Sequence, residues 1–288
     1  VFGVLWGVAM FGVQGSVKWD GSQVTLSAIM IAVLLHLFMI PETPGAMGEV
    51  RGNGEMFPLN GPHWSLFFEY IGNILYVLVL RKLSTRWLGI ITAIIGMGWA
   101  VFFLFDLAGY GNMGMGWTLD HANFWGGLLR MLFPFSVGLY MSRVFKPIKI
   151  HGAFWICTAI IVVLLSLPSM GSGDTAWMNI VFELACVSIA FPFVVLLVAS
   201  GQTTDPLTTR LCNFMGDISY PLYAIHYPTM YLFYAYIGFP QTWRTPAETW
   251  PWMIVLVAGN IALAYLVLKL YDQPVRKWLS KLTSPQTK

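Results

Sequence analysis

Three polar residues recur at helical intervals inside an apolar stretch, in the run NGPHWSLFFEYIGNILY over residues 60–76. If a helix begins near His63, then Ser65, Glu69 and Asn73 fall at i, i+4 and i+8 and share one face. An acidic residue at the centre of a membrane span costs about 2.5–3.5 kcal/mol on insertion scales, and such residues usually face a partner or a water-filled cavity. The stripe therefore predicts a functional site at Glu69, and a buried structural ion pair is the alternative.

Four further ionisable side chains lie in apolar runs: Asp106, Arg130, Glu183 and His226. Counted from the expected outer starts of their helices, Glu69, Arg130 and Glu183 lie at similar depths, about 8–10 Å at 1.5 Å per residue. By the same count His226 falls in the outer half of its helix. This shared depth predicts a common polar site open to the outer face, with Arg130 paired to Glu69 or Glu183. A purely structural Arg130–Glu183 pair and an interfacial role for Asp106 are the alternatives.

The composition is that of a polytopic membrane protein. Of the 288 residues, 57% are apolar and 10% are charged, and the mean hydropathy is +0.67, whereas soluble domains carry about 25% charged residues. Nothing in this composition supports nucleic acid binding. The three cysteines, Cys157, Cys186 and Cys212, have no metal-ligand spacing, so they are interpreted as small hydrophobic residues and no metal is expected.

Apolar runs long enough to cross a hydrocarbon core of about 30 Å recur along the chain. They lie near residues 1–17, 24–41, 64–80, 87–108, 124–142, 152–168, 177–200, 214–238 and 251–271. The expected fold is all-α, a bundle of about nine transmembrane helices that forms one domain over residues 1–288.

Lysine and arginine fall mainly on every second connection between these runs. Thirteen of the sixteen do so, from Lys18 through the loops at 81–86, 143–149 and 210 to the C-terminal segment 269–288. The positive-inside rule makes this side cytoplasmic. The C-terminus is then inside, Val1 is outside, and the long connection 42–63 with Arg51 is outside.

Pro221 and Pro228, in SYPLYAIHYP, are expected to kink or break a helix where neighbours can satisfy the freed carbonyls. His36 lies within a span, in IAVLLHLF, but no polar stripe accompanies it, so it is interpreted as structural. The sequence carries no Walker A, GxSxG, HExxH or dinucleotide-binding motif.

Four runs have the order and spacing typical of one family: FPLNGPHWSLFFEYIGNILY, GGLLRMLFPFSVGLYMSR, GDISYPLYAIHYP and YDQPVRKWL. From about residue 55 to its end the chain resembles the acyltransferase 3 family of integral membrane acyltransferases. The resemblance implies transfer of an acyl group, commonly acetyl from cytoplasmic acetyl-CoA, to a hydroxyl of a cell-surface or exported saccharide or glycolipid. It also implies a multi-pass protein of the bacterial inner membrane with acyl-CoA as its donor.

The family motif Trp-Ser-Leu-x-x-Glu falls on Trp64, Ser65 and Glu69, with Asn60 ahead of it. His63 stands where the family more often has a small or apolar residue. The resemblance implies catalytic roles for Glu69 and Ser65. The residues expected to support them or to bind substrate are Asn60, Trp64, Asn73, Arg130, Glu183 and His226.

Family members begin with a helix that carries an arginine and, about ten residues later, a histidine regarded as the catalytic base. No such pair is found here, and His36 lies too close to the Glu69 motif to be that histidine. We therefore expect the sequence to lack one or more N-terminal spans. One missing span would give ten and would put the N-terminus inside.

The chemistry implied is general acid and base catalysis, because a sugar hydroxyl is a weak nucleophile near neutral pH. Glu69 can orient the base or bind the acceptor hydroxyl, and Ser65 can hydrogen-bond the acceptor or carry the acyl group transiently. The basic cluster at 81–86 is a candidate partner for coenzyme A phosphates. Two alternatives stay open: a transporter or permease with a buried Glu/Arg/His site, and a non-catalytic membrane partner.

Overall fold

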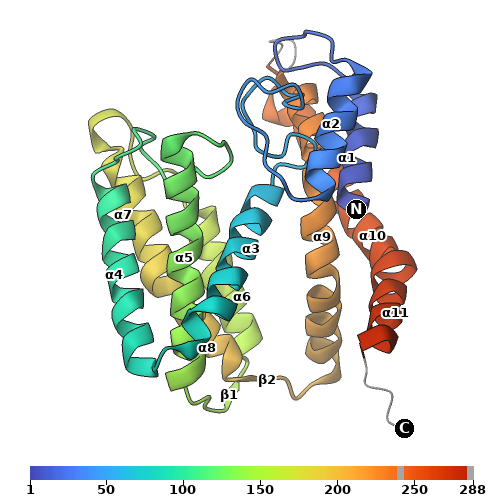
Figure 1. Cartoon of the computed structure of the whole chain (residues 1–288). Coiled ribbons are helices and arrows are strands. Elements are labelled where there is room, and N and C mark those ends of the chain that lie inside the picture. Colours follow the sequence, from blue (N-terminus) through green and yellow to red (C-terminus); the bar gives the residue numbers. More distant parts are fainter. Residues whose placement is uncertain (239–242, 284–288) are drawn as a thin grey trace. The chain divides into compact units, whose positions relative to one another are not determined.

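A computed structural model describes residues 1–238 and 243–283 of the chain (Figure 1). In this part of the chain 71% of the residues are helical and almost none form strands, which confirms the all-α prediction. The chain divides into two compact units. We call Val1–His63 with Leu211–Lys288 the terminal unit and Trp64–Arg210 the central unit. That residues 1–288 act as one domain stays a prediction.

The central unit is a helical bundle. Its elements are α3 (His63–Leu78), α4 (Thr85–Leu104), α5 (His121–Val144), α6 (Ala153–Ser166), α7 (Trp177–Ala185), a π-helical segment (Cys186–Ala190) and α8 (Phe191–Ala199). The first residue of α3, His63, belongs to the terminal unit. Side-chain caps define two starts: the Ser84 hydroxyl accepts from Trp87 N, and the Asp120 carboxylate accepts from Asn123 N. Helices α4 and α5 pack closely because Trp99 stacks on Phe133, with ring centroids 4.7 Å apart.

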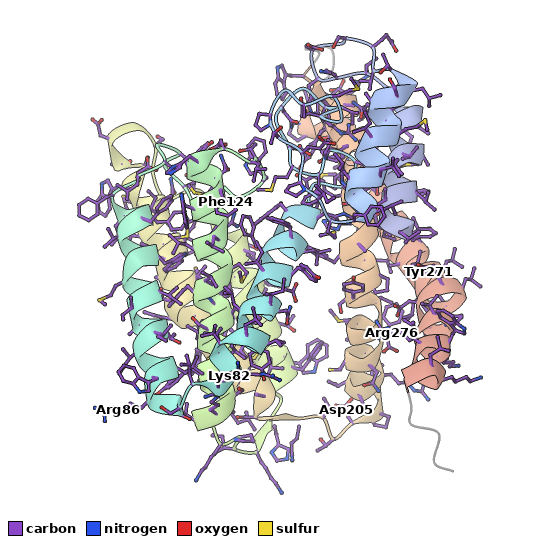
Figure 2. All side chains as sticks on the ribbon, in the orientation of Figure 1. Lys82, Arg86, Phe124, Asp205, Tyr271 and Arg276 are labelled. Atoms are coloured by element: carbon purple, nitrogen blue, oxygen red, sulfur yellow. The ribbon has the colours of Figure 1, made fainter. Side chains whose placement is uncertain are left out.

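At one end of the central unit, contacts join three of the connections between its helices, those after α3, α5 and α8. The Arg143 guanidinium donates to the carbonyls of Leu83, at 2.6 Å, and Leu80, at 3.2 Å. Strand β1 (Ile150–His151) pairs in parallel with β2 (Gly201–Gln202). Figure 2 shows Lys82 and Arg86 at this end together with Asp205, and Phe124 toward the other end. The basic loops at 81–86 and 143–149 therefore share one end of the unit, as the charge pattern predicts.

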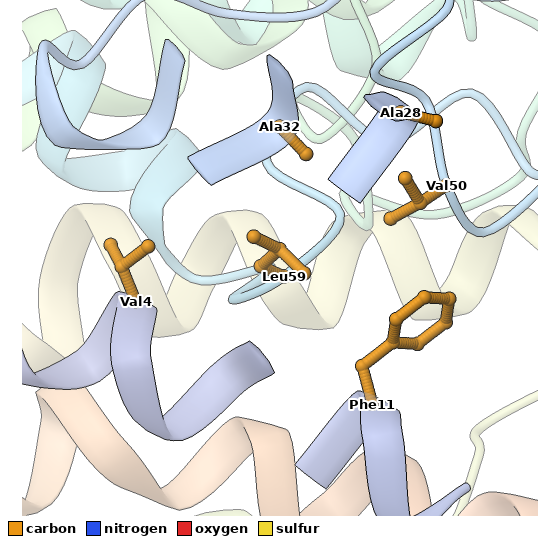
Figure 3. Packing of buried hydrophobic residues seen from close by; sticks show 6 residues of the cluster. All are labelled: Val4, Phe11, Ala28, Ala32, Val50 and Leu59. Atoms are coloured by element: carbon orange, nitrogen blue, oxygen red, sulfur yellow. The ribbon is translucent and has the colours of Figure 1, made fainter. Parts of the chain in front are cut away.

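The terminal unit consists of two short helices and two long ones. They are α1 (Phe2–Val13), α2 (Leu26–Leu37), α9 (Pro206–Gly238, from Leu211) and α10 (Pro246–Val267), which continues through a π-helical segment (Leu268–Asp272) into α11 (Gln273–Thr283). Its core residues include Val4, Phe11, Ala28, Ala32, Val50 and Leu59 (Figure 3). Gly7 permits this packing, because a Cβ there would lie 2.4 Å from the carbonyl oxygen of Leu59.

Each of the nine expected apolar runs coincides with a helical segment, but the segments differ in length. Four are long and apolar enough to cross a membrane: His63–Lys82, Thr85–Leu104, Gly173–Ala199 and Pro246–Leu282. Three apolar helices, α1, α2 and α6, have 12, 12 and 14 residues. At 1.5 Å per residue they are about 18–21 Å long, shorter than a hydrocarbon core of about 30 Å.

The expected placement of Lys18 on the opposite side from connection 42–63 is wrong. The backbone N–H of Trp19 donates to the carbonyl of Arg51 at 2.9 Å, and a Cβ on Gly52 would lie 3.2 Å from the Lys18 side chain. The physical reason is that α2 is too short to carry the chain across a bilayer, and the segment after it returns along α1. Lys18 therefore lies beside the 42–63 connection.

Candidate functional site

The polar stripe predicted on α3 is present. The Asn73 amide donates to the backbone carbonyl of Glu69 at 2.9 Å, one turn away. The Glu69 side chain is exposed, and within residues 64–210 its carboxylate has no hydrogen bond or ion pair. Trp64 and Ser65, at the start of the helix, are half-buried. Because this helix is one of the candidate spans, Glu69 presents an uncommitted carboxylate on a membrane helix.

The predicted ion pair of Arg130 is wrong. Neither Glu69 nor Glu183 lies within 4.0 Å of its guanidinium, and the ion pair found in the described chain is Arg276–Asp272, at 2.9 Å. Instead, the guanidinium donates to the backbone carbonyl of Met115 and lies 4.9 Å from the Trp64 ring centroid.

Glu183 is held by the same segment of backbone. Its carboxylate accepts a hydrogen bond from the N–H of Met113 at 2.8 Å. The segment 113–115 thus offers a donor to the carboxylate and an acceptor to the guanidinium. Two opposite charges are satisfied by backbone groups between them rather than by direct contact, which sequence spacing could not reveal.

Arg130 and Glu183 line a common cavity of about 630 Å³ in the central unit. Most of the remaining wall is apolar or aromatic: Trp99, Met113, Leu164, Leu165, Phe182, Cys186 and Phe191. Size and lining fit those of small-molecule sites, which are mostly apolar with a few polar groups. The π-helical segment Cys186–Ala190 contributes to the wall, and such segments are frequent at functional sites.

Of the predicted common site at one depth, only Arg130 and Glu183 share a cavity in this unit. Glu69 is not among the residues that line the Arg130–Glu183 cavity. Asp106 serves its own loop, because its carboxylate accepts from the N–H groups of Tyr110 and Gly111, both at 2.9 Å. His226 belongs to the terminal unit.

Asn60 lies in the terminal unit and compensates for a proline. Pro228 has no N–H, so it leaves the carbonyl of Ala224 without its helical donor. The buried Asn60 amide supplies that donor at 2.7 Å, and α9 continues through the proline without a break. The expected satisfaction of a freed carbonyl is thus confirmed, and it accounts for a buried asparagine at this position.

His226 has a defined tautomer. Its Nδ1 lies 3.1 Å from the carbonyl oxygen of Leu222 and 3.0 Å from that of Tyr223. Since carbonyl oxygens only accept, Nδ1 carries the proton and Nε2 is the basic nitrogen. His36 is arranged similarly, with Nδ1 at 3.1 Å from the Ala32 carbonyl, but it is fully buried, in keeping with a structural role.

A buried charge cluster in connection 42–62 was missed by the sequence analysis. Arg51 is fully buried and donates to the carbonyl of Pro58 at 2.9 Å. Its guanidinium lies over the rings of Tyr231, at 3.7 Å, and Phe11, at 4.9 Å. Gly52 and Gly54 adopt φ near +80°, so the turn RGNGE folds back on itself and brings Glu55 to the same place.

Glu55 is bonded on both carboxylate oxygens. One accepts from the Asn53 amide at 2.7 Å, and the other accepts from the Tyr231 hydroxyl. Burial raises the pKa of the Glu55 carboxyl, opposed by these two hydrogen bonds and by the charge of Arg51. The signal that could have found this cluster is the tyrosine spacing 223, 227, 231 and 234 on α9, which places four rings along one helix face.

The comparisons with known proteins bear on the whole chain. A family model described as an acyltransferase domain matches residues 1–269. No curated protein and no solved structure gives a match. Since the family model covers nearly all of the chain, the protein belongs to the acyltransferase 3 family and is a membrane acyltransferase.

Proposed function

We propose that the protein is a membrane-embedded O-acyltransferase that moves an acyl group, most simply acetyl, from acyl-CoA to a hydroxyl of a saccharide or glycolipid. The match of the acyltransferase family model over residues 1–269 carries this proposal. The uncommitted carboxylate of Glu69 on a candidate span supports it, because the reaction needs a group that can hold or take a hydroxyl proton.

In this reaction the acceptor hydroxyl oxygen attacks the thioester carbonyl. A C–O ester bond forms, the C–S bond breaks, the hydroxyl proton passes to the Glu69 carboxylate, and the coenzyme A thiolate takes up a proton and leaves as its thiol. General-base assistance in such a step is worth about 10²–10⁴-fold in rate. We assign Glu69 to the acceptor hydroxyl, where its carboxylate accepts the hydrogen bond. Ser65, one turn earlier on the same face, is assigned to the acyl group or the acceptor.

The remaining predicted residues take supporting roles in this proposal. Asn73 bonds the backbone of Glu69, and Arg130 and Glu183 hold the segment 113–115. Asn60 stabilises α9. His226 presents its basic nitrogen, Nε2, and the Trp64 ring centroid lies 4.9 Å from the Arg130 guanidinium.

We further propose that the basic end of the central unit faces the cytoplasm of a bacterial cell and that the C-terminus lies on the same side. Lys82 and Arg86 are at this end (Figure 2), and Arg81 shares a helical turn with Lys82, so the three are suited to meet the phosphates of a cytoplasmic acyl-CoA. The saccharide acceptor would then approach from the opposite face of the inner membrane.

The proposal is tested with purified protein in sealed liposomes. Labelled acetyl-CoA is supplied on one side and a soluble glycan acceptor on the other, with protein orientation determined by protease access to the C-terminal tail. Label in the glycan as an alkali-labile ester, dependent on donor at the C-terminal side, is the expected result. Glycan movement across the bilayer without ester formation would instead identify a transporter and would contradict the proposal.

A further inference from the structure

A second cavity, of about 460 Å³, lies in the terminal unit and contains none of the residues proposed for acyl transfer. It is lined by Trp19, Asn53, Glu55, Tyr227, Tyr231, Tyr234, Ile237, Gly238 and Trp243. Five of these nine residues are aromatic, and two others carry a carboxylate or an amide. The volume falls within the range of small-molecule sites, about 300–1,000 Å³. An aromatic wall with a few polar groups defines the kind of ligand it can take.

The aromatic rings are oriented by their helix and by one another. Tyr227, Tyr231 and Tyr234 follow one another on one face of α9. The first two rings meet edge to face, with centroids 4.8 Å apart and an interplanar angle of 88°. The ring centroids of Trp19 and Tyr231 lie 6.1 Å apart. Gly61 makes room for the tyrosines, because a Cβ there would lie 2.7 Å from the Tyr231 hydroxyl.

Hydrogen-bonding capacity remains free at this cavity. An ionised carboxylate can accept about four hydrogen bonds, and Glu55 accepts two, from Asn53 and Tyr231. In the described part of the terminal unit the hydroxyls of Tyr227 and Tyr234 have no hydrogen-bond partner. Phenolic hydroxyls both donate and accept. The cavity therefore offers acceptors and donors beside ring faces.

The charge at the cavity is balanced. The Arg51 guanidinium lies on the Tyr231 ring, 3.7 Å from its centroid, next to the Glu55 carboxylate that Tyr231 bonds. A quaternary ammonium ligand requires an aromatic cage whose negative potential is not already compensated. Here Arg51 supplies the cation, so a neutral ligand is favoured over a charged one.

We propose that this cavity binds one pyranose ring of the saccharide acceptor. A pyranose presents apolar C–H faces that pack on Trp19, Tyr234 and Trp243, and a rim of hydroxyls that bond Glu55 and Tyr227. That the bound sugar is the acceptor rests on the proposed function, whereas the recognition of a pyranose ring rests on the cavity alone. Residues 42–62, which contribute Glu55, are thus a substrate-binding segment.

The test is binding measured without any donor. The protein in nanodiscs is titrated with methyl β-glucopyranoside and methyl α-mannopyranoside, followed by saturation-transfer NMR, with choline chloride as the competing probe. Tyr234→Ala and Trp243→Ala remove rings that are 46% and 81% exposed, so the fold is expected to persist. Each should weaken glycoside binding about tenfold. Tyr220→Ala, a 56% exposed tyrosine of α9 outside the cavity, is the matched control and should bind as wild type.

Two further variants separate the contribution of ring packing to glycoside binding from that of hydroxyl hydrogen bonds. Trp243→Phe should retain most of the affinity, and Tyr227→Phe should lose hydrogen bonding with little change in melting temperature. Equal glycoside affinity in wild type, Tyr234→Ala and Trp243→Ala would overturn the proposal, and so would tight choline binding without glycoside binding.

Turnover distinguishes this inference from the proposed function. If acyl transfer occurs, Tyr234→Ala should raise KM for the acceptor about tenfold while kcat and KM for acyl-CoA stay unchanged. Normal acyl transfer with an unchanged acceptor KM in the variants would reject the sugar site and leave the proposed function intact. Loss of glycoside binding in the variants of a protein with no transferase activity would retain the sugar site and reject the proposed function.

Discussion

The terminal and central units handle their charged groups in opposite ways. In the terminal unit Arg51 and Glu55 are buried and bonded to neighbouring side chains and backbone. In the central unit Glu69 is exposed without a partner in that unit, and Arg130 and Glu183 each bond one backbone group at the edge of a cavity. Buried charges are costly unless they are bonded, so the bonds of the first arrangement mainly stabilise the fold and leave only spare acceptor capacity on Glu55, whereas the second arrangement is available for chemistry.

The contrast gives each unit a distinct sensitivity to mutation. Removing a group from the terminal cluster leaves other buried polar atoms unsatisfied, which costs stability. Removing the Glu69 carboxylate or the Asn73 amide, both on exposed residues of α3, takes no partner from a buried atom of residues 64–210, so any loss should appear in activity rather than in folding. A mutation in the terminal cluster that lowers only activity, or one in the α3 stripe that lowers only stability, would contradict this difference between the units.

The largest expected effect is that of Glu69→Gln on turnover. The amide retains the volume of the side chain but cannot take a proton or hold the acceptor hydroxyl as a carboxylate does. Acyl transfer should fall by about 10²–10⁴-fold, the range of general-base assistance, while the melting temperature stays unchanged. The rate is measured with labelled acetyl-CoA in liposomes.

Asp174→Asn is the matched control for Glu69→Gln, since it removes one exposed carboxylate from a connection of the same unit. It should retain wild-type turnover. Wild-type rates in Glu69→Gln at normal expression would exclude Glu69 from the mechanism, and a large drop in melting temperature would show that the carboxylate is structural after all.

The next effect is on stability, in Arg51→Met. The substitution removes a fully buried cation beside the Glu55 carboxylate and the hydrogen bond to Pro58. Breaking a buried charge pair from one side typically costs about 3–5 kcal/mol. Arg130→Met removes one hydrogen bond from a half-buried side chain and should cost about 1–3 kcal/mol. Denaturant unfolding in detergent measures both.

A double-mutant cycle shows whether the terminal cluster acts as a unit. Arg51→Met should cost less in the Glu55→Gln background, because no carboxylate is then left without its neighbouring cation. Strictly additive free energies of unfolding would mean that Arg51 and Glu55 are energetically independent. A cost for Arg130→Met as large as that for Arg51→Met would contradict the difference between the units.

The sequence predicted the helices well because apolar runs and helical spacing are local properties. The stripe Ser65, Glu69 and Asn73 is of this kind, whereas the bond from Asn60 to the Ala224 carbonyl joins distant segments. Helix ends were harder. The run 1–17 was interpreted as a span, whereas α1 ends at Val13 because Gly15 and Ser16 adopt positive φ and reverse the chain.

The charge contacts could not be predicted because they depend on how distant segments return. Arg130 was expected to pair with a carboxylate, but the segment 113–115 enters between the two charges and bonds both. Arg51 and Glu55 lie in a connection that reads as a polar, glycine-rich outer loop. Their burial arises only when that loop folds against α1 and the tyrosines of α9, and hydropathy carries no signal of it.

A smaller loss of stability is expected in Asn60→Ala. The Ala224 carbonyl then loses the donor that replaces the missing N–H of Pro228, and a buried unsatisfied group costs about 1–3 kcal/mol. Asn73→Ala is the matched control, because its amide also bonds a helix carbonyl but lies on an exposed face. It should change the free energy of unfolding by no more than about 0.5 kcal/mol.

Pro228→Ala provides the decisive background for Asn60. Residue 228 then has an N–H that can donate to the Ala224 carbonyl, so Asn60→Ala should cost less than it does in the wild type. An identical cost in both backgrounds would mean that the asparagine stabilises the unit by packing alone.

The smallest expected effect is the dependence of stability on pH. Burial raises the folded-state pKa of Glu55, so between its unfolded pKa and this raised value the folded protein binds more protons than the unfolded chain. The free energy of unfolding must therefore fall as pH rises through that interval, by at most about 1.4 kcal/mol per pH unit for one group. Glu42, whose pKa is raised by burial and by Glu49, adds a slope of the same sign.

Melting temperatures measured upward from pH 4.5 should decline in the wild type, less steeply in Glu55→Gln, and least in the variant that also carries Glu42→Gln. A slope that Glu55→Gln leaves unchanged would show that the buried carboxyl is as ionised in the folded protein as in the unfolded chain, and the charge of Arg51 would then outweigh the cost of burial.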